Sequence, residues 1–339
     1  MTNDIRIATP TGTYIGHKNG VADEFLGIKY GKFVGPWKRL AALDTTEKDE
    51  FICAEHSPAC IQPPDPCVYA SAGKLAVEDS ITLNLWTKDS GNHSFAKPVM
   101  VYFYGGGFVE GGNVDPAIQG ENFVAATPEG EDAVLITVNY RIGIFGGMDL
   151  SFLEGYSEEE YGECNNIWIL DQISALQWVH DNVAYFGGDP DNVTIFGQSA
   201  GSMSVAFLSV LPEANKLFHK GIMESGIPFF AVAEVGKKLQ VAKNICADLG
   251  ITTIEELISK DDDFWRENYS KEFRNNASLM PPRCFDKTLP ADFWNRFIHG
   301  AAKDIPLMIG CGNGELDMYA YKRGSFPERV SVEEAVQTA

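Results

Sequence analysis

Short apolar segments alternate with longer helix-like segments along the chain, and this alternation constrains the fold more than any other feature. Eight apolar runs of four to eight residues are rich in β-branched or aromatic residues, as β-strands are: IRIA, FLGIKY, ITLNLW, PVMVYFY, AVLITVNY, VTIFG, GIMESG and IPLMIG. Several are almost continuously apolar, which is typical of a sheet covered on both faces. The pattern predicts an α/β fold with a mostly parallel central sheet and helices on both faces.

Helix-like patterns lie between the later runs. In 166–183, Leu170 and Ile173 fall near one face of a helix together with further apolar residues. Other helices are predicted over 199–210, 236–249 and 290–299. The acidic stretches 154–163 and 260–263 are predicted to be surface loops.

Length and composition are consistent with one large domain. The chain has 339 residues, of which 45% are hydrophobic, and this is enough to bury a large core. No internal repeat or low-complexity linker divides it, so a single α/β domain over 1–339 is predicted. The net charge of −20 argues against nucleic acid or an anionic membrane as a partner, because no basic stripe is present to neutralise phosphates.

Several features predict a cytoplasmic protein without a cofactor. The N-terminal MTNDIRIATPTG lacks the apolar core of a signal peptide, and no apolar stretch reaches the roughly eighteen residues of a membrane helix. The seven cysteines do not have metal-ligand spacing, which favours idle thiols in a reducing compartment. We therefore expect no metal and no organic cofactor.

The segment 193–210 places Ser199 at a sharp corner. VTIF is a predicted strand, GQSAG a turn and SMSVAFLSV a helix. A nucleophile elbow needs this arrangement, with small residues such as Gly197 and Gly201 where the backbone packs tightly. The helix start would then direct the Ala200 N–H towards a developing oxyanion. The alternative is an ordinary serine in a glycine-rich turn, but the strand before it and the helix after it favour a nucleophile.

A second glycine-rich segment, YGGGF, follows the strand PVMVYF directly. Consecutive glycines allow the backbone to turn its N–H groups towards a ligand at close range. A phosphate-binding loop does not fit, because no Gly-Lys-Ser/Thr follows. The remaining alternatives are a flexible strand exit and the second half of an oxyanion hole, with Gly106 and Gly107 as donors.

Together these segments resemble the type-B carboxylesterase/lipase family, the branch of the α/β-hydrolases that includes the cholinesterases. The matching stretches follow the family order: FLGIKY, EDSITLNLW, YGGGF, ITVNYRIG, DQISALQWVHDNVAYFGGDPDNVTIFGQSAG and IMESG. The resemblance implies an α/β-hydrolase fold. It also implies that the chain corresponds to the N-terminal two-thirds of a family domain and is C-terminally incomplete.

The resemblance assigns roles to individual residues. Ser199 becomes the nucleophile, and Gly106, Gly107 and Ala200 become the oxyanion hole. The acid falls on Glu315, in IPLMIGCGNGELDMY. Because the usual Asp-Glu-Gly is replaced by Gly-Glu-Leu, Asp317 stays an alternative acid, and Glu315 could also be an ordinary loop carboxylate.

Other positions carry weaker implications. Ser225, in IMESG, resembles a serine that supports the triad without belonging to it. An ordinary serine at the end of a strand is an equal alternative. Gln198 stands where the family most often has glutamate. Secreted relatives form a disulfide to a cysteine at the position of Ser80, so Cys60 is expected to lack that partner. No tryptophan lies between Cys60 and Ser80, which argues against choline esters as substrates.

The base that would activate the serine is not evident. A serine nucleophile needs a histidine held by a carboxylate, and in this fold the chain order is serine, acid, histidine. The six histidines are His17, His56, His93, His180, His219 and His299. None follows Glu315, so we expect the base to lie in a missing C-terminal segment.

The leading prediction is therefore a serine hydrolase that cleaves small-molecule carboxylic esters through an acyl-enzyme intermediate. The possible macromolecular partner is the missing C-terminal segment. Two alternatives are kept: a non-catalytic, cholinesterase-like binding protein, and an inactive fragment that lacks the triad histidine.

Overall fold

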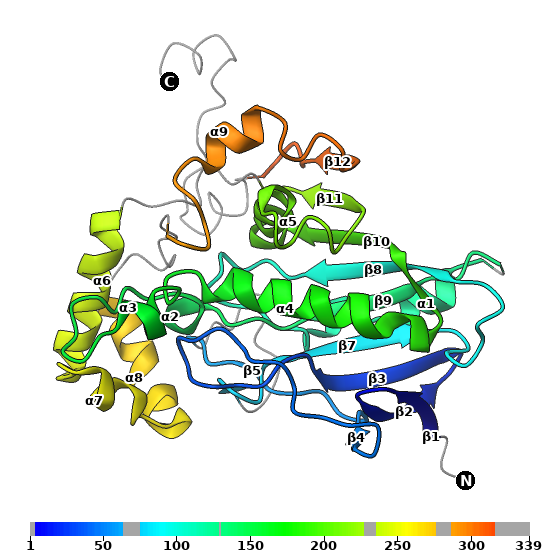
Figure 1. Cartoon of the computed structure of the whole chain (residues 1–339), viewed down its shortest axis with the longest axis horizontal. Coiled ribbons are helices and arrows are strands. Elements are labelled where there is room, and N and C mark those ends of the chain that lie inside the picture. The colour runs from blue at the N-terminus through cyan, green and yellow to red at the C-terminus, as the bar shows by residue number, and fades with distance from the viewer. Residues whose placement is uncertain (1–3, 64–74, 129, 227–234, 276–285, 316–339) are drawn as a thin grey trace.

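The computed structural model describes residues 4–63, 75–128, 130–226, 235–275 and 286–315. Within them, a ten-stranded sheet has the order β1-β2-β3-β7-β9-β8-β10-β11-β12, with β4 paired to β2, and β5 pairs with β6 separately (Figure 1). The strands are β1 Asp4–Thr9, β2 Gly12–Asn19, β3 Ala22–Lys29, β4 Glu50–Ile52, β5 Ala59–Cys60, β6 Leu75–Ala76, β7 Thr82–Thr87, β8 Lys97–Phe103, β9 Val134–Val138, β10 Gly188–Gln198, β11 Lys220–Glu224 and β12 Leu307–Gly310.

The sheet has two halves of different direction. From β9 through β8, β10 and β11 to β12 every neighbouring pair is parallel, as predicted. From β1 through β2, β3 and β7 to β9 every pair is antiparallel. Short connections explain the first two of these pairs, because a two-residue link such as 20–21 between β2 and β3 can join only antiparallel strands. The α/β class is confirmed, and parallel pairing describes the C-terminal half of the sheet.

The helices include those that the sequence predicts. They are α1 Glu121–Ala126, α2 Gly143–Gly146, α3 Glu158–Tyr161, α4 Ile167–Asn182, α5 Ala200–Val210, α6 Val235–Leu249, α7 Ile254–Ile258, α8 Asp262–Asn275 and α9 Phe293–Ile298. Both acidic stretches lie largely on the surface, as predicted, but they are not entirely loops: 154–163 contains the single turn α3, and 260–263 leads into α8. Acidic side chains in the first turn of each helix favour helix formation through the helix dipole.

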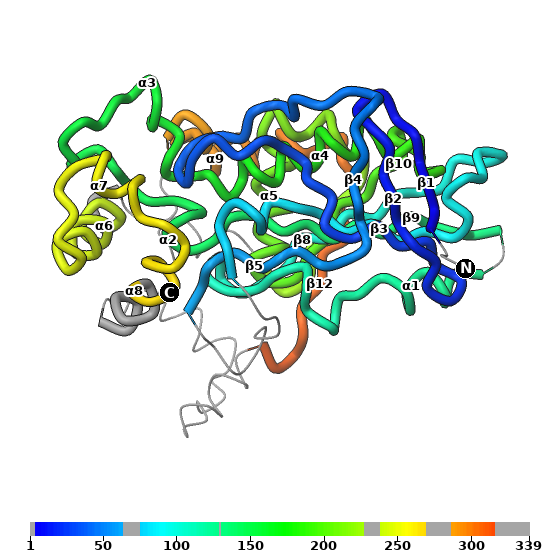
Figure 2. The backbone as a smooth tube through the Cα atoms, turned by 90° about the horizontal axis from the view of Figure 1, so that it is seen from below, coloured from blue at the N-terminus to red at the C-terminus, as the bar shows by residue number. Residues whose placement is uncertain are grey.

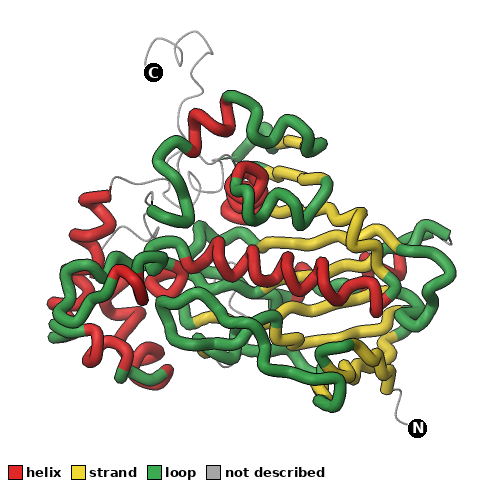
Figure 3. The backbone as a smooth tube through the Cα atoms, in the orientation of Figure 1, coloured by secondary structure: helices red, strands yellow, loops and turns green. Residues whose placement is uncertain are grey.

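Helices cover both faces of the sheet. Figure 2 shows α4 and α5 on one side and α1 on the other. Because side chains alternate across a strand, Leu85 joins the main core while its neighbour Trp86 joins a small second core with Val124 of α1. Helices α6, α7 and α8 gather at one end of the sheet, away from the N-terminus (Figure 3). None of the described helices is long and apolar enough to cross a membrane.

Strand β12 is the edge of the sheet in the part of the chain that the structure describes. Its sequence, LMIG, is apolar, yet Met308 is 68% exposed and Ile309 is 61% exposed. These two neighbours point to opposite faces of the sheet, so both faces are uncovered at this edge.

Candidate active site

Ser199 occupies the corner between β10 and α5. Strand β10 ends at Gln198 and α5 begins at Ala200, and Ser199 between them has φ 55° and ψ −117°. This backbone conformation is costly for a residue with a side chain. The Ser199 N–H donates to the Glu224 carbonyl at 2.9 Å, and the Ser199 carbonyl accepts from the Met203 N–H at 3.0 Å. Hydrogen bonds on both sides therefore hold the strained residue in place.

The two glycines that flank Ser199 are required by close backbone contacts. A Cβ on Gly201 would lie 1.9 Å from the Phe103 carbonyl oxygen, and one on Gly197 would lie 2.5 Å from the same oxygen. Both distances are shorter than any real Cβ contact. The tight corner predicted from GQSAG is therefore present, with the start of α5 pressed against the end of β8.

The glycine-rich loop lies directly beside this corner. An ideal Cβ on Gly105 would lie 3.4 Å from the Ser199 Cβ and 3.0 Å from the Gln198 side-chain oxygen. Gly106 and Gly107 follow with φ of 93° and 62°, a left-handed backbone that favours glycine. The structure thus brings the loop that carries Gly106 and Gly107 next to Ser199. Ala200 also lies here, as the first residue of α5, where a helix has unpaired N–H groups.

Glu315 and Ser225 contact one another. The Ser225 hydroxyl lies close enough to the Glu315 carboxylate to lower its pKa, and the Gly312 N–H donates to Glu315 Oε1 at 2.5 Å. Both donors stabilise the charged form and hold the pKa of Glu315 below its usual value. Ser225 itself has φ 54° and donates its N–H to the Gly310 carbonyl at 2.8 Å. Asp317, the alternative acid, lies outside the described residues.

None of the six histidines, all of which the structure describes, hydrogen-bonds to Ser199 or Glu315. His219 Nδ1 accepts the Val193 N–H at 3.1 Å near the start of β10. Val193 lies six residues before Ser199, so this ring is about 20 Å from the corner. The other ring contacts are with Glu24 for His17, Asn84 for His56, Asp181 for His180 and Asn295 for His299.

Cys60 and Ser80 meet in the interior, as the resemblance implied. Both residues are buried, the Ser80 hydroxyl donates to the Val77 carbonyl at 2.8 Å, and its side chain lies near the Cys60 thiol. Burial raises the pKa of the Cys60 thiol to about 12, so the thiol stays protonated and unreactive. Cys60 is a free cysteine, with a serine where a disulfide partner would stand.

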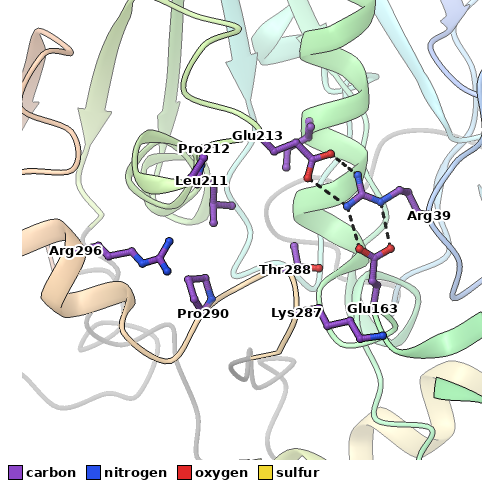
Figure 4. A pocket seen from close by; sticks show the side chains of 10 residues that line it. Arg39, Glu163, Leu211, Pro212, Glu213, Lys287, Thr288, Pro290 and Arg296 are labelled. Atoms are coloured by element: carbon purple, nitrogen blue, oxygen red, sulfur yellow. Dashed lines mark hydrogen bonds and ion pairs between the residues drawn. The ribbon is translucent and has the colours of Figure 1, made fainter. Parts of the chain in front are cut away.

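A cavity of about 370 Å³ lies elsewhere and contains none of the predicted site residues (Figure 4). On its wall, the Arg39 guanidinium donates to the carboxylates of Glu163 and Glu213, which come from segments far apart in the sequence. Arg296 across the cavity is paired with Asp292. These cations are already neutralised, so we interpret the cavity wall as an ion-pair link between elements.

The sequence prediction missed two supports of the site. The Tyr104 and Tyr140 rings stack at 4.4 Å, and each hydroxyl donates to the other residue's carbonyl. Arg141 and Asp171 form a fully buried ion pair that joins the segment after β9 to α4. An arginine inside the apolar stretch ITVNYRIG is the sequence signal that could have indicated such a pair.

Comparisons with known proteins agree with this geometry. Residues 3–337 match the profile of the carboxylesterase family. The chain is 35% identical over 331 residues to the para-nitrobenzyl esterase of Bacillus subtilis (strain 168), covering 93% of this chain and 63% of that protein. A solved carboxylesterase of Geobacillus stearothermophilus superposes with a TM-score of 0.81 at 29% identity, covering 94% of this chain and 64% of that one. A thermophilic para-nitrobenzyl esterase superposes with a TM-score of 0.80 at 32% identity, covering 97% of this chain and 67% of that one.

The sheet and its helices define an α/β-hydrolase fold. The chain belongs to the carboxylesterase family. It spans less than two-thirds of the length of the Bacillus subtilis relative.

Proposed function

We propose that the carboxylesterase domain to which these residues belong hydrolyses small-molecule carboxylic esters, with Ser199 as nucleophile. The observation that carries the proposal is the strained Ser199 corner next to the loop of Gly106 and Gly107. Ser199 Oγ attacks the ester carbonyl carbon and passes its proton to a base. The N–H groups of Gly106, Gly107 and Ala200 stabilise the oxyanion. The alcohol then leaves with a proton, and water hydrolyses the acyl-enzyme to release the acid.

Glu315 is the proposed acid that orients the base. Its lowered pKa keeps the carboxylate ionised at neutral pH, as a triad acid requires. Ser225 supports this carboxylate from the end of β11. Because none of the six histidines hydrogen-bonds to Ser199 or Glu315, the proposal assigns the base to a histidine of the C-terminal segment that would complete the domain.

The open edge at β12 offers a place for the polypeptide that carries this histidine. A strand that pairs in parallel with β12 would end at the same edge of the sheet as Ser199 and Glu315. It would also cover the exposed side chains of Met308 and Ile309. The proposed partner is therefore the C-terminal segment of a family domain. Together with residues 1–339 it would form one complete domain.

A cytoplasmic location belongs to the same proposal. Cys53, Cys60, Cys164 and Cys246 are buried free thiols, and such thiols are typical of a reducing compartment.

The non-catalytic alternative keeps one specific observation in its favour, which is the absence of a histidine at Ser199. A binding protein would need the fold but not the chemistry. Ester hydrolysis that depends on Ser199 would distinguish an esterase from a binding protein, because a binding protein does not need the serine hydroxyl. An inactive fragment is the third outcome, in which the chain neither hydrolyses esters nor recruits a partner.

The test is hydrolysis of p-nitrophenyl acetate and butyrate by the chain alone and after addition of the C-terminal third of the Bacillus subtilis esterase. We expect turnover in the mixture and its loss in Ser199→Ala. Ser209→Ala is the matched control, because Ser209 lies on the same helix with its hydroxyl bonded to Val205 O at 2.7 Å. Turnover that survives Ser199→Ala would overturn the proposal.

A further inference from the structure

Gln62 hydrogen-bonds to the backbone of the glycine-rich loop through both the nitrogen and the oxygen of its carboxamide. Its Nε2 donates to the Gly111 carbonyl at 2.8 Å, and its Oε1 accepts the Gly111 N–H at 2.8 Å. The same Nε2 lies 3.0 Å from the Cys60 carbonyl, to which it also donates. A side chain that satisfies both the donor and the acceptor of one residue fixes the two peptide groups on either side of that residue.

Gly111 closes the loop that begins at Gly105. It has φ 113°, and a Cβ there would lie 2.5 Å from the Tyr104 ring and 3.2 Å from the Gly105 carbonyl oxygen. Inside the loop, the Gly106 carbonyl accepts the N–H groups of Val109 at 3.0 Å and Glu110 at 3.1 Å. The start and the end of the loop therefore lie against one another, and the position of Gly111 is transmitted to Gly106.

This loop needs support from outside. Gly106, Gly107 and Gly111 all have positive φ, and glycine is the residue with the greatest backbone freedom. Two other contacts support its backbone: Tyr140 Oη donates to the carbonyl of Tyr104, just before the loop, at 2.7 Å, and the carbonyl of Phe108, in its middle, accepts the Gly143 N–H at 2.7 Å. Gln62 supplies the support at the far end, from a segment almost fifty residues earlier in the chain.

We infer that Gln62 is a positioning residue of the oxyanion loop, which holds Gly111 so that the N–H groups of Gly106 and Gly107 stay aimed at the reacting carbonyl. The inference rests on the proposed function, and it adds a residue that the triad and the oxyanion donors do not include. Gln62 acts through the loop and does not touch the substrate. Its loss would misalign donors whose contribution depends on fixed geometry.

The first test is amide hydrogen exchange on the full chain, which does not require activity. Gln62→Met keeps the length of the side chain and removes both hydrogen bonds to Gly111. We expect the amides of 105–111 to exchange at least about tenfold faster, because two supporting hydrogen bonds are lost. The matched control is Gln119→Met: Gln119 Nε2 donates to the carbonyls of Asn113 and Asp115, at 3.1 and 2.7 Å, further along the chain. This variant is expected to leave 105–111 unchanged.

The second test separates positioning from stability. In the p-nitrophenyl acetate assay described above, Gln62→Met is expected to lower kcat by about 100-fold, the size of the loss of one oxyanion donor, with KM within about twofold. Gln62→Glu still accepts the Gly111 N–H but cannot donate. Its kcat is therefore expected to lie between the kcat of the wild type and that of Gln62→Met. Unchanged exchange in Gln62→Met overturns the inference whether or not esters are hydrolysed. Faster exchange with unchanged kcat also overturns it. If the mixture with the unsubstituted chain shows no turnover, the result contradicts the proposed function and not the role of Gln62. The hydrogen-exchange result then decides the role of Gln62.

Discussion

At the scale of single residues, backbone strain is concentrated at the candidate site. Four non-glycine residues have positive φ among those that the structure describes, and three of them, Phe108, Ser199 and Ser225, lie at the site. Strain of this kind persists only where the surroundings over-determine the conformation. Here the determinants are backbone hydrogen bonds to each of the three residues. The concentration of strain supports the assignment of the site independently of sequence motifs.

Gly201→Ala is expected to destabilise the protein severely. The added Cβ would be 1.9 Å from the Phe103 carbonyl oxygen, so the start of α5 must move away from β8. We expect the free energy of unfolding in urea to fall by about 3 kcal/mol or more. In the control Gly91→Ala, the Cβ has nothing within 4 Å, and the change is expected to stay within about 0.5 kcal/mol. Equal stability of the two variants would contradict the close contact.

The Ser225 hydroxyl is expected to control the titration of Glu315. In the folded protein the pKa of Glu315 is below its usual value, first because of Ser225 and then because of the Gly312 N–H. The associated stability is present above the unfolded pKa and is lost as the pH falls through the folded pKa. Ser225→Ala should raise the folded pKa towards the ordinary glutamate value, which carboxyl-carbon NMR measures. Ser209→Ala should leave it unchanged.

At the scale of elements, the sequence predicts the hydrophobic strands well and the polar elements poorly. Each of the eight apolar runs overlaps a strand of the main sheet. Strand β2 was missed because its inward positions include Gly12 and Gly16, where no apolar side chain indicates burial; a Cβ on Gly16 would lie 2.2 Å from the Glu24 carbonyl oxygen. Helix α3 is not evident in the sequence because it is a single turn, and α8 is not evident because its many charged residues obscure the apolar face that carries the buried Trp265.

The same contrast holds for the candidate site. The serine corner and the glycine loop are each formed by a few consecutive residues, so a sequence motif is enough to predict their geometry. The hydrogen bonds of Gln62 to Gly111 and of Tyr104 to Tyr140 join segments far apart in the chain. They depend on tertiary packing, which no local pattern of residue types encodes.

The buried ion pair is expected to tie α4 to the sheet. Arg141 and Asp171 side chains are both fully buried, and Arg141→Met would leave the Asp171 carboxylate uncompensated. We expect a loss of about 3–5 kcal/mol in the free energy of unfolding, and recovery of much of it in the double variant with Asp171→Leu. The exposed pair of Arg296 and Asp292 is the control, since Arg296→Met is expected to cost less than about 1 kcal/mol. Similar losses in both single variants would contradict this prediction.

At the scale of the whole molecule, the two edges of the sheet differ in the part of the chain that the structure describes. Strand β1 lies at one edge and forms an antiparallel hairpin with β2, whereas β12 at the other edge exposes its apolar side chains and its outer backbone groups. Exposed apolar edge strands favour pairing with other chains. The net charge of −20 opposes such pairing through repulsion between copies, and salt weakens this repulsion.

Met308→Lys is expected to reduce self-association without unfolding the chain. Met308 is 68% exposed, so a charge there has little desolvation cost, and the change in the free energy of unfolding is expected to stay within about 0.5 kcal/mol. Sedimentation velocity at high salt should show less association than for the wild type. The control Lys220→Met, at an exposed position near the start of β11, should not reduce association. An unchanged sedimentation profile in Met308→Lys would show that β12 is not the contact.

The hydrogen bonds across the last three strands have a consequence for control of the site. Ser225 N–H binds Gly310 at the end of β12, and Ser199 N–H binds Glu224 at the end of β11. A molecule that binds at β12 and shifts these hydrogen bonds would therefore change the free energy of the Ser199 conformation, two strands away. Thermodynamic linkage makes this coupling reciprocal: a reversible ligand on Ser199 tightens the occupant of β12 by the same factor by which that occupant tightens the ligand.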